Sequence, residues 1–333
     1  MKNASKWSGS GGGNASADRL SPRHGEPRGC FNSLGFSGHG GVSLPGDVSP
    51  WLAITLRVLN AAGFLAVAVV NGVVGSGLGV PNTIGDVSDA NPTPITPSGY
   101  AFSIWSLIYI FQAILFLVYQ FTPCVNRHLV FQRIGFWHVA LCAFNIAWIF
   151  AFCYAQLLLS AVLIWAMLGS LATIYVRLYT HYGSWLGPQQ VRQQRTWVEY
   201  FCIYVPWALY TSWLLGASLI NIFTAIGSPV NDIIYGGLGA LAAAGFVNLM
   251  ILAWTRDVWF AGVNVWTLIA IADNQSDLPM IWGAAVTIAG VVGAAAAVTW
   301  ARNVWDLFDR GNTTTDGQQP EKHHPQFLVS STV

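Results

Sequence analysis

The chain has 333 residues, of which 54% are hydrophobic and only 9% are charged. Soluble domains usually carry about 25% charged residues, so this chain has too few charges to cover a surface that faces water. The composition excludes an ordinary soluble domain and predicts an integral membrane protein with the lipid bilayer as partner. The 16 tryptophans suit a protein with two membrane interfaces, and the net charge of +1 gives no reason to expect nucleic acid.

Two tails are predicted. Residues 1–50 are rich in Gly, Ser, Asn and Pro and contain no periodic apolar pattern. Such a segment cannot bury enough apolar surface to fold, so we predict a disordered N-terminal tail. A transit peptide is an alternative, because arginine and serine outnumber the acidic residues there. Residues 302–333 are predicted to form a second disordered tail.

Between the tails, eight apolar runs have roughly the 20 residues that a transmembrane helix needs. They lie at 52–74, 99–121, 134–153, 157–180, 201–224, 232–254, 258–273 and 279–300. The fold class is therefore an all-α membrane protein, a bundle of about eight transmembrane helices, with five in 51–225 and three in 231–301. Only three residues separate the third and fourth runs, which predicts a tight antiparallel pair. The seventh run is short, and a tilted or partly re-entrant helix is an alternative there.

Charge placement tests the number of spans. When eight spans are threaded from an inside N-terminus, all 15 lysines and arginines fall on the inside. The other side carries only acidic charges, at Asp86, Asp89, Asp232, Asp273 and Asp277. The positive-inside rule predicts this asymmetry. Both termini are therefore expected on the cytosolic or equivalent basic side, and the sequence does not name the organelle.

Several kinds of chemistry lack their residues. No Asp, Glu or Lys lies in the middle of a run, where such groups usually mark proton relays and ion coupling. The P-loop, HExxH and GxSxG motifs do not occur, so we expect no catalytic residue, no metal site and no required cofactor. The five cysteines form no CxxC pair, and no disulfide framework is predicted. For His138, a hydrogen-bonded histidine and a heme or metal ligand are both open.

Aromatic and amide side chains instead recur on helix faces. They are Phe102, Trp105 and Tyr109 in the second run, Asn145 and Trp148 in the third, and Tyr210, Trp213 and Asn221 in the fifth. Such stripes serve helix packing or line a pocket, and buried amides join helices or contact a ligand. Because these stripes reach the middle of their helices as well as the ends, we favour a pocket.

The loop at 75–98 is long, polar and rich in proline. A long ordered loop over the mouth of a bundle is a candidate lid, and either Thr96 or Ser98 is the expected cap of the helix that follows. The expected lid residues are Asn82, Pro97, Tyr100 and Phe102.

The eighth run is rich in glycine and alanine from Gly283 onwards. Small residues let helix backbones approach closely. The run predicts either an internal packing face or the seam of a homodimer, and the sequence does not separate the two.

Three blocks carry a family resemblance: TPSGYAFSIWSLIYIFQA at 96–113, ALCAFNIAWIFAF at 140–152 and YVPWALYTSWLLGASLINIF at 204–223. They resemble the translocator protein family, also called tryptophan-rich sensory proteins or peripheral-type benzodiazepine receptors. The likeness covers about 51–225, and the last three helices resemble an extended form of the family. The Trp-x-Pro-Pro of the family's first loop is not intact here, where the chain reads NPTPITPSGY.

The resemblance implies a helical bundle whose pocket opens under the loop between the first two helices. Family members bind porphyrins and other planar hydrophobic molecules, and some bind sterols. For this chain, it implies a pocket lined by Trp105, Tyr109, Asn145, Trp148, Tyr210, Trp213 and Asn221, with a porphyrin as a ligand candidate. No pair of cationic residues lies within the predicted bundle to bind porphyrin propionates.

The sequence leaves three candidate functions. The leading prediction is a multi-pass binding or sensory protein for a planar lipophilic ligand such as a tetrapyrrole or a sterol-like molecule, and not an enzyme. The first alternative is an uncoupled transporter or channel for a small lipophilic or neutral solute. The second alternative is a porphyrin-modifying enzyme.

Overall fold

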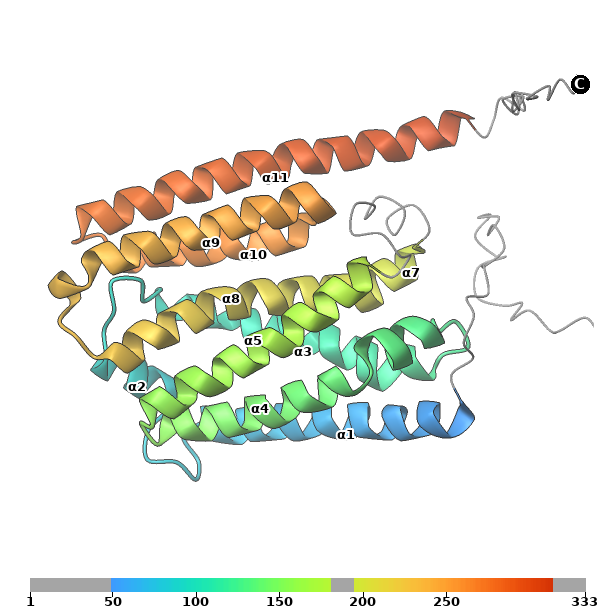
Figure 1. Cartoon of the computed structure of the whole chain (residues 1–333), viewed down its shortest axis with the longest axis horizontal. Helices are drawn as coiled ribbons and strands as arrows, with labels where there is room; N and C mark the ends of the chain where they lie inside the picture. Colours follow the sequence, from blue (N-terminus) through green and yellow to red (C-terminus); the bar gives the residue numbers. More distant parts are fainter. Residues whose placement is uncertain (1–48, 181–194, 314–333) are drawn as a thin grey trace, which may run out of the picture. The chain divides into compact units, whose positions relative to one another are not determined.

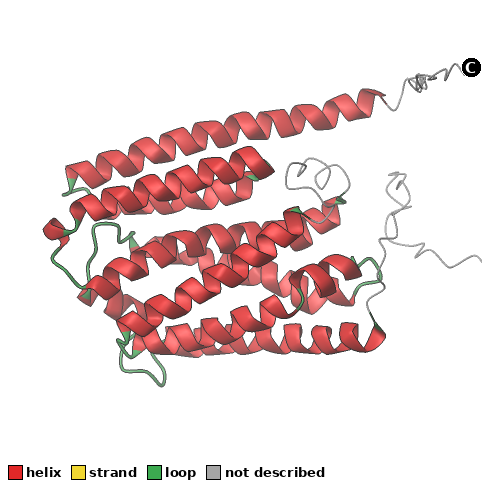
Figure 2. Cartoon of the chain, viewed as in Figure 1, coloured by secondary structure: helices red, strands yellow, loops and turns green. Residues whose placement is uncertain are grey.

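The computed structural model describes residues 49–180 and 195–313, and within these ranges the regular structure is helical, without strands (Figure 2). The chain is an all-α membrane bundle, as the apolar runs predict. The predicted N-terminal tail lies almost wholly outside the described residues, as does the end of the predicted C-terminal tail.

The first five spans follow the predicted order, with several irregular turns. The bounds are α1 Pro50–Gly75; a 3₁₀ turn Gly99–Ser103, α3 Ile104–Ala113, a π turn Ile114–Val118 and a 3₁₀ turn Tyr119–Phe121; α4 Phe136–Cys153, preceded by a π-helical segment His128–Ile134; α5 Leu157–Tyr179; and α7 Trp197–Glu199, a π turn Tyr200–Tyr204 and α8 Val205–Ile226. Gly135 separates the π segment from α4 with φ +49°, a conformation that glycine adopts without strain.

The last three spans are α9 Ile234–Thr255, α10 Val258–Asn274 and α11 Pro279–Thr313, with a 3₁₀ turn Val230–Asp232 before α9. The predicted disordered tail from residue 302 is wrong at its start, because α11 continues as a helix to Thr313. Hydropathy marks where a helix leaves the apolar layer, and here the helix itself runs on beyond that point.

Seven helices of the described ranges are long and apolar enough to cross a membrane. The eighth predicted span is α10, whose 17 residues form one unbroken helix. A helix of 17 residues is about 26 Å long at 1.5 Å per residue, which lies near the lower limit for a spanning segment. Whether α10 spans the membrane, tilted or not, or is partly re-entrant stays a prediction.

The helices pack both against their neighbours in sequence and against the next helix but one (Figure 1). Helix α4 lies against α1 and α5, α5 lies against α8, and α9, α10 and α11 pack together, with α10 also against α8. Backbone bonds from Tyr154 to Phe150 and from Gln156 to Ala151 close the turn between α4 and α5, with Ala155 at φ 55°. The predicted tight pair of third and fourth helices is confirmed.

One face of α11 provides internal packing. Ile281, Ala285, Ala289 and Val292 are buried against α9 and α10. On α9, a Cβ atom added to Gly245 would lie 2.5 Å from Cγ2 of Ile288, so only glycine allows this approach. The internal packing face predicted for the eighth run is therefore present, and the homodimer seam stays a prediction.

Exposed aromatic side chains gather at both ends of the spans. Trp51 near the start of α1 and Trp305 near the end of α11 are 80% and 74% exposed. Tyr154 and Tyr235, at the opposite helix ends, are 51% and 74% exposed. Amphipathic rings of this kind sit at the headgroup level of a bilayer, so two aromatic belts frame the apolar bundle.

A buried carboxylate joins α10 to α5. Asp257, the N-cap of α10, accepts bonds from the backbone N–H groups of Trp259 (3.1 Å) and Phe260 (3.2 Å) through Oδ1. Its Oδ2 accepts from the hydroxyls of Tyr175 (3.0 Å) and Tyr179 (2.7 Å) on α5. Four donors thus satisfy this carboxylate, which ties the last three helices to the first five.

The cysteines differ in one respect from the prediction. Cys124 is disulfide-bonded, although the sequence predicts no disulfide framework. Cys142, Cys153 and Cys202 are free. The spacing of cysteines along a sequence does not reveal such a pairing, because only the fold decides which sulfurs meet.

Candidate functional site

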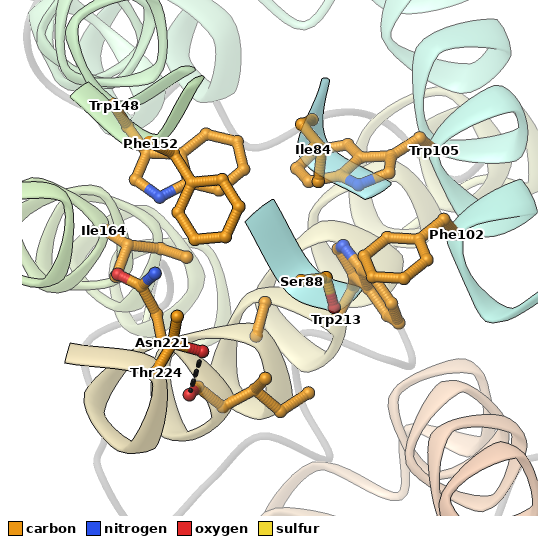
Figure 3. A pocket seen from close by; sticks show the side chains of 12 residues that line it. Ile84, Ser88, Phe102, Trp105, Trp148, Phe152, Ile164, Trp213, Asn221 and Thr224 are labelled. Atoms are coloured by element: carbon orange, nitrogen blue, oxygen red, sulfur yellow. Dashed lines mark hydrogen bonds between the residues drawn. The ribbon is translucent and has the colours of Figure 1, made fainter. Parts of the chain in front are cut away.

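A cavity lies where α3, α4, α5 and α8 meet under α2 (Ile84–Ala90), a short helix within the first loop (Figure 3). Its volume is about 40 Å³. The lining residues are Ile84, Ser88, Phe102, Trp105, Trp148, Phe152, Ile164, Trp213, Ala217, Ile220, Asn221 and Thr224.

Four of the seven predicted pocket residues line this cavity: Trp105, Trp148, Trp213 and Asn221. Figure 3 shows Trp148 and Phe152 across the cavity from Phe102 and Trp105. The rings of Trp148 and Phe152 stack at 5.6 Å, and Trp213 meets Phe102 edge-to-face at 5.8 Å. The structure therefore brings residues of three separate predicted stripes to one place.

The other three predicted residues, Tyr109, Asn145 and Tyr210, are not among the lining residues and instead support Trp105 and the wall. Tyr109 stacks on Trp105 at 5.6 Å, and Tyr210 meets the same indole edge-to-face at 5.6 Å. Asn145 donates to the Tyr210 hydroxyl (3.0 Å) and accepts from Asn71 (2.7 Å). This series of hydrogen bonds links α1, α4 and α8. Tyr109, Asn145 and Tyr210 therefore hold the aromatic wall in position.

The first loop contains a helix that the sequence analysis missed. Thr83 and Asp86 form a capping box: the Asp86 carboxylate accepts from the Thr83 N–H (2.8 Å) and the Thr83 hydroxyl accepts from the Asp86 N–H (3.1 Å). These bonds lower the pKa of the Asp86 carboxyl below its ordinary value. The box starts α2, which places Ile84 and Ser88 over the cavity.

The predicted lid residues lie mostly elsewhere. Only Phe102 lines the cavity; Asn82, Pro97 and Tyr100 do not. Asn82 donates to the Cys153 carbonyl (3.2 Å), and Tyr100 packs edge-to-face on Trp266 of α10.

Neither expected cap of the second span acts as one. Ser98 occupies the N-cap position of the 3₁₀ turn but makes no capping bond. Its hydroxyl donates to Asp273 instead (2.7 Å). The Thr96 hydroxyl accepts from the Thr93 N–H (2.9 Å). Both side chains thus serve contacts within the loop or with α10.

Several lining residues escaped the sequence analysis, and two signals point to them. Ile220 and Thr224 extend the stripe of Trp213 and Asn221 by helical spacing, which a longer window would include. The Thr83–Asp86 pattern is a capping-box signature, and it indicates a helix that brings Ile84 and Ser88 over the bundle. Ile164 carries no such signal, since it is one of many apolar residues in α5.

The cavity is apolar with a few polar groups and no charged side chain in its lining. Asn221 accepts from the Ser160 hydroxyl (3.2 Å), and the Thr224 hydroxyl donates to the Ile220 carbonyl (3.1 Å). The indole N–H groups of Trp148 and Trp213 are buried without a hydrogen-bond partner. Buried donors of this kind are rare, and they suit a ligand that carries an acceptor.

His138 lies apart from the cavity lining and has partners on both ring nitrogens. Nδ1 lies 3.2 Å from Oδ1 of Asn60, and Nε2 lies 3.3 Å from Sγ of Cys142. The ring also stacks on Phe116 at 3.8 Å. These contacts favour the hydrogen-bonded histidine over the heme or metal ligand. Within the described ranges, no group of three or more His, Cys, Asp and Glu side chains is arranged to hold a metal ion.

The comparisons with known proteins give one result. No curated protein and no solved structure matches the chain. The model of the family described as TSPO-like protein matches residues 57–298. The match extends past residue 225, where the resemblance of the sequence blocks ends, and includes α9, α10 and most of α11. Because the match covers well over half of the chain, the chain belongs to the TSPO-like protein family.

Proposed function

We propose that this membrane protein binds a planar lipophilic molecule, a tetrapyrrole or a sterol-like compound, in the cavity under α2. The observation that carries the proposal is the convergence of Trp105, Trp148 and Trp213, from three different helices, on one cavity without charged lining. Aromatic faces and edges favour flat rings through stacked and edge-to-face contacts. A few placed polar groups among apolar walls are typical of small-molecule sites.

The size of the cavity constrains how a ligand enters. Sites for drug-sized molecules usually measure about 300–1,000 Å³, whereas this cavity measures about 40 Å³. A planar ligand therefore requires the walls to separate. Of the lining elements, α2 is the shortest, with seven residues, and it is the natural part to move because it lies in a loop.

The lining also bears on the charge of the ligand. A carboxylate in an apolar site needs a paired cation, and the lining contains none. The unpartnered indole N–H groups of Trp148 and Trp213 supply donors for a neutral acceptor such as a carbonyl or an ester. We therefore expect an uncharged ligand to bind more tightly than the same ring system with free carboxylates.

Titration in detergent with protoporphyrin, its dimethyl ester and a sterol, followed by tryptophan fluorescence, tests the proposal. We expect saturable quenching, with the ester bound at least as tightly as the diacid. Trp105→Ala should weaken binding about tenfold, since aromatic pairs contribute about 0.5–1.5 kcal/mol beyond their buried area, while the protein stays folded.

Trp305→Ala is the matched control, because this exposed tryptophan lies at the far end of α11. Its removal should leave the affinity unchanged. Quenching that does not saturate, or that is equal in folded Trp105→Ala and the unmodified protein, would reject the cavity as the site. Flux of a neutral solute through proteoliposomes would then favour the uncoupled transporter.

A further inference from the structure

The loop between the first two spans has two parts with different anchors. We name residues 93–101 the clamped segment and residues 84–90, which form α2, the lid helix. The clamped segment leads directly into Phe102 and Trp105, which line the cavity, and the lid helix contributes Ile84 and Ser88.

Side chains at the C-terminal end of α10 hold the first half of the clamped segment. Gln275 donates through Nε2 to the carbonyls of Thr93 (3.3 Å) and Thr96 (2.9 Å). Asn274 donates to the same Thr96 carbonyl (3.1 Å). Gln275 is buried, so water does not compete freely for these bonds.

The second half of the clamped segment is held by α10 as well. Ser98 donates its N–H to the Ala270 carbonyl (2.9 Å) and its hydroxyl to Asp273 (2.7 Å). Trp266 donates its indole N–H to the Ala101 carbonyl (3.3 Å). Six hydrogen bonds therefore join this short segment to one helix of the three-helix part.

The lid helix makes no comparable hydrogen bonds to the bundle in the described part of the chain. It is held by packing alone, through the buried side chain of Val87 in the large core. Its capping and side-chain bonds stay within residues 83–91, as in the bond from Asn91 to the Val87 carbonyl. The nearest links to the bundle lie before it, from Asn82 to the Cys153 carbonyl (3.2 Å) and from Tyr154 to the Gly79 carbonyl (3.5 Å). Gly77 and Gly79 adopt φ of 83° and 76° in that linker, a region where glycine moves freely.

We propose that α10, and through it the three-helix part, is a positioning element for the ligand cavity. Asp273, Asn274 and Gln275 fix the clamped segment, so that opening for a ligand is confined to the lid helix and the wall of Phe102 and Trp105 stays in place. This inference rests on the proposed ligand site for its consequence, but the difference in anchoring exists without any ligand.

Hydrogen–deuterium exchange of the full chain in lipid nanodiscs tests the inference. Without ligand, amides of the clamped segment should exchange more slowly than those of the lid helix. In Asp273→Ala/Gln275→Ala, exchange in the clamped segment should rise by about tenfold or more, because the bonds from the buried Gln275 and the exposed bond between Ser98 and Asp273 are lost. Exchange in the lid helix should stay the same. Asp273→Asn, which keeps an acceptor oxygen, should restore part of the protection.

Asp277→Ala is the control, because this exposed acid lies at the same end of the bundle and should leave exchange unchanged. With protoporphyrin dimethyl ester as the probe, the lid helix should gain protection and the clamped segment should not. Equal exchange of both segments, or a clamped segment that the double variant does not affect, would overturn the inference. The expected pattern without ligand, together with failed binding, would instead reject the proposed function alone.

Discussion

The first five spans and the last three bury their residues in different ways. The large core of the five-helix part contains Trp148, Trp207, Trp213 and several tyrosines. The two other cores are built mainly by α9, α10 and α11, with Phe223 of α8 and Ile95 of the first loop. They contain no tryptophan or tyrosine, and apart from Phe223 they consist of alanine, leucine, isoleucine and valine. Large rigid rings leave space between them, whereas small residues let backbones close together. The cavity under α2 lies among the rings.

The buried amides differ in their hydrogen bonding. Near the cavity, Asn145 donates to Tyr210 and accepts from Asn71, and Asn221 accepts from Ser160. By contrast, both side-chain amide atoms of Asn248 on α9 are buried without a partner, as are those of Gln112 on α3. Hydrogen-bonded amides therefore join helices around the cavity, whereas Asn248 and Gln112 join none.

The largest expected effect comes from breaking the joint between the two parts. Asp257→Ala leaves the hydroxyls of Tyr175 and Tyr179 and two backbone N–H groups without their acceptor. Because bonds to a buried charge are strong, we expect a loss of about 3 kcal/mol in the free energy of unfolding, measured by thermal or denaturant unfolding in detergent.

Asp306→Ala provides the control for that joint. Asp306 pairs with Arg256 at 3.0 Å in a partly exposed ion pair, and such pairs contribute about 0–1 kcal/mol. If both variants lose the same free energy of unfolding, the hydrogen bonds of Asp257 stabilise the protein no more than the ion pair of Arg256 and Asp306 does.

A smaller effect sharpens the contrast between the amides. Asn145→Leu should destabilise the protein by about 1–2 kcal/mol, since it leaves Asn71 and Tyr210 without a buried partner. Asn248→Leu removes an amide that has no partner, so it should be neutral or stabilise the protein by about 1 kcal/mol. Both changes are measured in the same unfolding assay. A loss in Asn248→Leu as large as that in Asn145→Leu would remove the contrast.

The smallest effect concerns the lid helix and pH. Hydrogen bonds from Thr83 lower the pKa of the exposed Asp86 carboxyl from 3.8, so the carboxylate favours the folded helix. This stabilisation is complete above pH 3.8 and is lost as the pH falls through the lowered pKa. Amide exchange in residues 84–90, corrected for intrinsic rates, should therefore rise at the acidic end of that window. In Asp86→Asn the rise should be absent.

The sequence predicts the spans well because their signals are long and independent of one another. Apolar runs predict the helices, and the placement of the arginines and lysines favours eight of them. It fails at α2, where seven residues among prolines give too little periodicity to stand out, and at the end of α11, where Arg302 and Asp306 continue the helix outside the apolar layer. The disulfide of Cys124 carries no local signal.

The sequence predicts which helix faces surround the site, but not which residues of each face reach the cavity. Trp105 and Tyr109 share one face of the second span, yet only Trp105 lines the cavity. Which residue of a stripe reaches the cavity depends on how far the neighbouring helices are shifted along their axes, because this shift decides which rings meet, here Tyr210 and Trp105. A single sequence shows which residues share a helix face, but it does not show the axial shift between helices.

The joint at Asp257 also has a consequence for biosynthesis. The two tyrosines that it binds precede it by 82 and 78 residues. At about 5–20 residues per second, the ribosome needs about 4–16 seconds to supply the carboxylate after α5 has been made. During that interval the C-terminal end of α5 presents two tyrosine hydroxyls without their acceptor. A nascent chain that stops before α10 would therefore retain two buried hydroxyls without their carboxylate acceptor.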